Sequence, residues 1–78
     1  MATILSQDGF QVMIFTNDHP PAHVHVFKAG TEAVINLAPV SIRENYRMSP
    51  KNLRKAVDIV TENQDLLLPA WREIHDNE

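Results

Sequence analysis

Residues 23–37 have the sequence His-Val-His-Val-Phe-Lys-Ala-Gly-Thr-Glu-Ala-Val-Ile-Asn-Leu, and this stretch decides the fold. Residues 23–28 and 32–37 are predicted strands, because both are rich in the β-branched residues that strands favour. Ala29 and Gly30 lie between them, and the glycine supplies the positive φ that a tight turn requires. The stretch therefore predicts an antiparallel β-hairpin.

The expected register separates this hairpin into two faces. With the turn centred on residues 29 and 30, His23 lies opposite Asn36. Side chains alternate along a strand, so His23, His25, Glu32 and Asn36 share one face. The other face is nearly all apolar, and we expect helices to cover it. Its residues are Val24, Val26, Ala33, Ile35 and Leu37.

Two further strands are predicted on either side of the hairpin. Residues 10–15 have the sequence Phe-Gln-Val-Met-Ile-Phe, follow an Asp-Gly turn dipeptide and have the composition of a strand. Residues 16–21 end in two prolines, which fix φ and remove two hydrogen-bond donors, so we expect a loop there. Residues 40–46 are predicted to return as a fourth strand.

Two helices are predicted after the strands. Ser49 is a suitable N-cap and is followed by proline, which places the first helix at residues 50–62 with Asn63 as its C-cap. A second apolar stripe predicts another helix, which Pro69 should start or kink. The stripe consists of Leu67, Ala70, Trp71 and Ile74. The predicted fold class is therefore α+β: a three- to four-stranded antiparallel sheet with two C-terminal helices packed on one face.

The composition limits the class of protein. Seventy-eight residues predict a single domain at residues 1–78, of a size at which assembly into a homo-oligomer often supplements a small core. The absence of cysteine excludes disulfides and thiolate ligands, so a divalent metal would need nitrogen and oxygen ligands. No apolar run approaches membrane-spanning length, and the N-terminus lacks a signal-peptide pattern. We therefore expect a cytoplasmic protein with no membrane partner.

Charge is distributed unevenly along the chain. The formal net charge is −3, but five of the seven Lys and Arg residues fall within residues 43–55, where Glu44 is the single acid. A basic segment can bind an anion such as a nucleic-acid phosphate, although surface cations also simply keep a small protein soluble. The candidate anion-binding residues are Arg43, Arg47, Lys51 and Arg54.

Three of the four histidines lie within seven residues, at His19, His23 and His25. Positions i and i+2 of a strand are about 6–7 Å apart on one face, so His23 and His25 can reach one metal ion, with His19 supplied by the loop. Glu32 and Asn36 would support such a site. The same imidazoles can instead act as general acid and base on a phosphodiester. A third interpretation gives them only a structural role, capping an exposed strand or packing against a second subunit.

Several short motifs occur together in this chain. They are Asn-Asp-His-Pro-Pro-Ala-His-Val-His-Val at residues 17–26, Arg-Glu-Asn at residues 43–45 and Ala-Trp-Arg-Glu-Ile-His at residues 70–75. In these motifs the chain resembles the DUF4160 family, a bacterial family of domains of unknown function, over almost its whole length. It departs from the family pattern at Arg47, where glycine is usual.

The resemblance implies a small α+β domain. Members of the family are often encoded beside DUF2442 proteins, in gene pairs suggestive of toxin–antitoxin systems, so the resemblance also implies a DUF2442-type partner protein. It marks several positions for a role in a functional site. These positions are Asp18, His19, His23, His25, Glu44, Asn45 and Ser49.

Two hypotheses about function combine these observations. The first is a toxin-like component of a toxin–antitoxin pair that acts on RNA or nucleotides. In it, Asp18, His19, His23 and His25 are catalytic and the basic segment holds the phosphate. The second is a metal-binding or protein-interaction domain without catalytic activity. Both hypotheses use the same histidines, but only the first makes the protein an enzyme.

Overall fold

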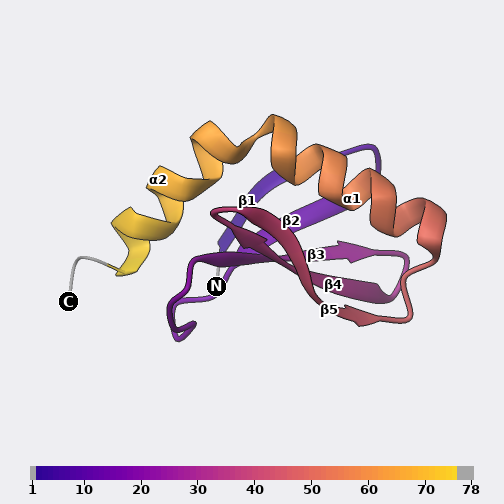
Figure 1. The fold of residues 1–78 in the computed structure, drawn as a ribbon, viewed down its shortest axis with the longest axis horizontal. Helices are drawn as coiled ribbons and strands as arrows, with labels where there is room; N and C mark the ends of the chain where they lie inside the picture. The colour runs from indigo at the N-terminus through magenta and orange to yellow at the C-terminus, as the bar shows by residue number, and fades with distance from the viewer. Residues whose placement is uncertain (1, 76–78) are drawn as a thin grey trace.

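The computed structural model describes residues 2–75. Over this range the chain forms five β-strands followed by two α-helices (Figure 1). In chain order they are β1 (Ala2–Gln7), β2 (Phe10–Ile14), β3 (His23–Lys28), β4 (Thr31–Leu37), β5 (Val40–Tyr46), α1 (Pro50–Glu62) and α2 (Gln64–His75). The strands form one antiparallel sheet in the order β1-β2-β3-β4-β5, so each strand pairs with its neighbours in sequence.

The prediction of three to four strands is wrong, because the chain also forms the N-terminal strand β1. Asp8 and Gly9 have φ angles of 54° and 80°, and they make the tight turn that returns the chain from β1 into β2. The pairing of β1 with β2 shifts register between Thr3 and Leu5. Ile4 and Leu5 are adjacent and both half-buried. The register shift interrupts the alternation of apolar and polar residues by which an isolated strand is recognised.

The central hairpin has the predicted register. His23 pairs with Asn36, and His25 pairs with Val34. The two turn residues have φ angles of 48° and 78°, and a turn with two left-handed residues matches the twist of the flanking strands. His23 and His25 therefore lie on one face of the sheet, as expected.

Both helices pack on the opposite face, also as predicted (Figure 1). The five apolar hairpin residues are fully buried beneath them. The N-cap of α1 is Ser49, whose Oγ accepts a hydrogen bond from the Asn52 amide at 3.1 Å. The second helix begins at Gln64, so Pro69 lies inside it and does not start it. The helices contribute Ala56, Ile59, Val60, Leu67 and Trp71 to the core. No helix within residues 2–75 combines the length and the apolar character needed to cross a membrane.

Arg47 adopts an unfavourable backbone conformation just after β5. Its φ is 71°, in the left-handed region where the Cβ atom of an L-residue is crowded by the backbone. The Asn45 side chain closes this turn: it accepts a hydrogen bond from the Met48 amide at 2.9 Å and donates one to the Met48 carbonyl at 3.0 Å. The conformation explains why glycine suits this position.

Replacing Arg47 by glycine should stabilise the protein by about 0.5–1 kcal/mol, because relief of the left-handed strain exceeds the entropy that glycine adds to the unfolded chain. Urea unfolding followed by Trp71 fluorescence measures the free energy of unfolding. Arg47→Ala is the matched control, since it removes the charged side chain but keeps the Cβ atom. Equal stability of the glycine and alanine variants would contradict this explanation.

Candidate functional site

Asp18, His23 and His25 are the group of potential metal ligands that residues 2–75 bring together. Each offers one ligand atom, and these atoms all lie within 4.8 Å of one another. Both histidines come from β3, whereas Asp18 comes from the loop between β2 and β3. Asp18 Oδ2 is 3.1 Å from His25 Nε2, and Asp18 Oδ1 is 3.5 Å from His23 Nε2. We call these three residues the Asp18 cluster.

The loop places the Asp18 carboxylate by a local turn. The Phe15 amide donates a hydrogen bond to Asp18 Oδ2 at 3.2 Å, and the Asp18 amide donates to the Phe15 carbonyl at 3.1 Å. Turns of this kind, in which an aspartate side chain accepts from a nearby backbone amide, are typical of Asp in loops. The Phe15 ring also stacks on the His25 ring, with 4.2 Å between centroids. The turn and the ring contact therefore fix Asp18 over β3.

The Nδ1 atoms of the two histidines face hydrogen-bond acceptors. His23 Nδ1 lies 2.9 Å from the Pro21 carbonyl oxygen, and His25 Nδ1 lies 2.9 Å from Glu32 Oε2. Because a carbonyl oxygen and a carboxylate can only accept, each of these two contacts is a hydrogen bond when Nδ1 carries the proton and donates it. The Nε2 atom of each ring is thereby turned toward the Asp18 carboxylate.

The Asp18 cluster is largely shielded from solvent. The side chains of His23, Asp18 and His25 are 6%, 11% and 13% exposed. Arg43 approaches from β5, where its Nη1 lies 3.3 Å from His23 Nδ1. A guanidinium thus places a positive charge beside the cluster, on the side of His23 away from Asp18. Charges interact more strongly in such a partly dry environment than in water.

A family model described as a domain of unknown function, DUF4160, matches residues 9–72. The chain belongs to the DUF4160 family. The matched span of this DUF4160 protein contains the whole Asp18 cluster together with Glu32 and Arg43. No curated protein and no solved structure matches the chain.

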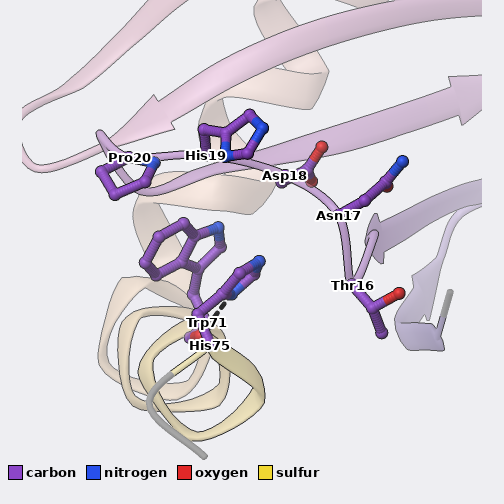
Figure 2. Close-up of a pocket in the computed structure, with 7 residues that line it drawn as sticks. All are labelled: Thr16, Asn17, Asp18, His19, Pro20, Trp71 and His75. Carbon is purple, nitrogen blue, oxygen red and sulfur yellow. Dashed lines mark hydrogen bonds between the residues drawn. The ribbon is translucent and has the colours of Figure 1, made fainter. Parts of the chain in front are cut away.

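His19 does not join the cluster of this DUF4160 protein. It is exposed and lines a cavity between the loop and the end of α2, together with Trp71 and His75. Figure 2 shows the two helix side chains on one side of the loop, whereas the His19 ring and the Asp18 carboxylate project to the other side. Asp18 therefore occupies the place that the sequence had suggested for His19.

The candidate cations are spread over different parts of the DUF4160 domain. Arg43 lies beside His23, but Arg47 lies in the turn after β5, where its backbone forms an isolated β-bridge with that of Glu32. Lys51 and Arg54 lie on α1, which covers the opposite face of the sheet. The structure therefore brings only the first of these four cations to the histidines.

The remaining marked residues make local contacts. Asn36 donates to Ser41 Oγ at 3.1 Å, on the histidine face of the sheet but outside the Asp18 cluster. Glu44 accepts a hydrogen bond from the Tyr46 hydroxyl at 2.6 Å, and this bond raises the pKa of Tyr46. Asn45 and Ser49 close the turn after β5 and cap α1, as described above. These residues therefore stabilise the local backbone and neighbouring side chains.

Proposed function

We propose that this DUF4160 protein binds a divalent first-row transition metal through Asp18, His23 and His25. The observation that carries the proposal is the orientation of the two imidazoles. Each ring is held at Nδ1 by an acceptor and directs Nε2 at the same carboxylate. Metal-binding histidines in proteins are oriented in this way by a carboxylate or a backbone carbonyl.

The separations between ligand atoms suit a small metal ion. Zinc bonds of about 2.0–2.1 Å at tetrahedral angles separate neighbouring ligand atoms by about 3.3 Å. The two measured separations between Asp18 oxygens and histidine Nε2 atoms are 3.1 Å and 3.5 Å, on either side of that value. The three ligand atoms as a group lie within 4.8 Å of one another, so the cluster must contract to coordinate a metal at all three.

The donor set narrows the choice of metal. Two imidazole nitrogens and one carboxylate oxygen suit Zn²⁺ and Fe²⁺ better than the all-oxygen ions Ca²⁺ and Mg²⁺. Three protein ligands leave a position for water or another ligand. Because the metal must displace a proton from any Nε2 that donates to Asp18, the affinity should fall as the pH is lowered.

Isothermal titration calorimetry with Zn²⁺ tests the proposal. The wild-type protein should bind one equivalent saturably, whereas His23→Ala and His25→Ala should each lose this binding. His19→Ala and His75→Ala are matched controls, because each removes an imidazole that lies outside the Asp18 cluster. Failure of the wild-type protein to bind, or equal losses in all four variants, would refute the proposal.

Glu32 should increase the affinity of the site for the metal through its contact with His25 Nδ1. Replacing Glu32 by glutamine keeps the shape of the side chain but removes its charge, so we expect Zn²⁺ affinity to fall by about 10–100-fold. Calorimetry at fixed pH measures the change. Glu44→Gln serves as the control, since Glu44 bonds to Tyr46 and not to a histidine. Equal affinities of the two variants would exclude a role for Glu32 at the site.

A second candidate function is action on RNA or nucleotides, as a toxin-like component paired with a DUF2442 protein. The observation that favours it is the Arg43 guanidinium beside His23, because a cation near an imidazole can hold a phosphate during acid–base chemistry. The test is RNA cleavage and growth arrest on expression, each compared between the wild type and Arg43→Ala. Charge reversal at Arg47 and Lys51 should have less effect, because Lys51 lies across the sheet from the histidines and Arg47 lies in the turn after β5.

A further inference from the structure

A cavity of about 430 Å³ lies between the loop after β2 and the C-terminal end of α2 (Figure 2). It is lined by Thr16, Asn17, Asp18, His19, Pro20, Trp71 and His75. We call it the Trp71 cavity. Its volume is within the range of about 300–1,000 Å³ that is usual for small-molecule sites.

Two ring nitrogens at this cavity are buried and unpaired. Trp71 Nε1 and His75 Nε2 have no hydrogen-bond partner among the residues that the structure describes. Trp71 is only 6% exposed, so its N–H group is removed from bulk water. Buried polar groups in native proteins nearly always have a partner, so each of these nitrogens is expected to bind either an ordered water or a ligand.

The hydrogen-bonding character of each nitrogen follows from its surroundings. An indole nitrogen can only donate. His75 Nδ1 lies 2.8 Å from the Trp71 carbonyl oxygen and therefore carries the proton, which leaves Nε2 of the neutral ring as an acceptor. The two rings are stacked, with 3.9 Å between centroids and 20° between planes. A donor thus lies next to an acceptor just behind the cavity wall, and Figure 2 shows both nitrogens on the side that faces the loop.

The charges around the cavity favour a neutral ligand. The lining residues include no lysine or arginine to hold a phosphate or a carboxylate. Asp18 is the one acidic residue in the lining, and its carboxylate is engaged by Phe15, His23 and His25. A ligand with a planar ring and an acceptor beside a donor would satisfy both unpaired nitrogens.

We propose that the Trp71 cavity binds a nucleobase, which accepts a hydrogen bond from Trp71 Nε1 and donates one to His75 Nε2. Nucleobases carry such adjacent donor and acceptor groups on their pairing edges, and proteins commonly bind them beside aromatic and histidine rings. Both nitrogens are buried, so access requires a small outward movement of the loop or of the His75 ring. This inference goes beyond the proposed metal site and does not depend on it.

The test uses the indole N–H signal of Trp71 in a ¹H–¹⁵N NMR spectrum, because the chain contains one tryptophan. Uridine should shift this signal saturably, with a dissociation constant on the order of 0.1–1 mM for a ligand of its size. N3-methyluridine keeps the acceptors of uridine but lacks the ring N–H donor. It should bind at least about 10-fold more weakly, because His75 Nε2 would remain unpaired.

A protein variant tests the same hydrogen bond by removing the acceptor, His75 Nε2. His75→Phe keeps an aromatic ring over Trp71 but removes the acceptor, so uridine should bind at least about 10-fold more weakly. Arg72→Ala is the control, since Arg72 is exposed and does not line the cavity. An otherwise unchanged spectrum would show that the variant is folded. The proposal is overturned if no ribonucleoside shifts the indole signal at concentrations up to about 10 mM. It is also overturned if N3-methyluridine binds the wild-type protein, and uridine binds His75→Phe, as tightly as uridine binds the wild-type protein.

Discussion

Replacing Asp18 by asparagine should lower the affinity for Zn²⁺ by at least about 100-fold, because the loss of a direct ligand should exceed the 10–100-fold typical of supporting residues. Asparagine is chosen because its amide oxygen can still accept the Phe15 N–H bond that shapes the loop. The fold should therefore survive while the anionic ligand is lost. Calorimetry with Zn²⁺ provides the affinity.

Asp58→Asn is the matched control for this experiment. Asp58 is an exposed carboxylate on α1, on the opposite face of the sheet from the Asp18 cluster. Its substitution makes the same change in net charge without touching a proposed ligand. If Asp18→Asn and Asp58→Asn both retained wild-type affinity, Asp18 would not be a metal ligand.

Replacing Leu67 by alanine should destabilise the protein by about 2–5 kcal/mol, the usual cost of removing a buried leucine side chain and leaving a cavity. Leu67 is fully buried where α2 packs on the sheet. Small domains have total stabilities toward the low end of about 5–15 kcal/mol, so this loss should leave the variant largely unfolded on modest warming.

The neighbouring Leu66 provides the control for Leu67. It is 51% exposed on the same helix, so Leu66→Ala should change the free energy of unfolding by no more than about 0.5 kcal/mol. Urea unfolding of both variants, followed by Trp71 fluorescence, gives the two values. Similar destabilisation by both substitutions would mean that the packing of α2 described above is incorrect.

The central hairpin could be predicted because its signals are local. The Ala29-Gly30 turn and the alternation of residues on both sides fix one register, and that register places Glu32 near His25. The distance of 2.9 Å between Glu32 and His25 is a direct consequence. In contrast, β1 was missed because its register shift leaves no regular alternation to recognise.

The composition of the Asp18 cluster could be predicted only in part. The Asp18 carboxylate and the His19 ring project to the same side of the loop, but the turn at Phe15 brings only the Asp18 carboxylate onto β3, whereas His19 stays exposed. The proximity of three histidines in the sequence concealed this difference. The signal that could have revealed the position of Asp18 is its spacing of three residues from Phe15, because an aspartate side chain at this spacing can accept a hydrogen bond from the Phe15 amide.

Contacts between distant segments could not be read from the sequence. Arg43 and Lys51 are eight positions apart, yet one lies beside the histidines and the other lies on the helix over the opposite face. The Trp71 cavity likewise joins a loop to a helix more than 50 residues later. Its one local signal is the spacing of four residues between Trp71 and His75, which places both rings on one side of a helix.

The most direct test of the metal site is a Zn²⁺ titration of the histidine side chains, followed by long-range ¹H–¹⁵N NMR. The Nε2 signals of His23 and His25 should shift saturably at one equivalent of Zn²⁺. Their Nδ1 atoms should stay protonated, and His19 and His75 should be unaffected. Shifts dominated by His19, or no saturable shift in His23 and His25, would contradict a metal site built on Asp18, His23 and His25.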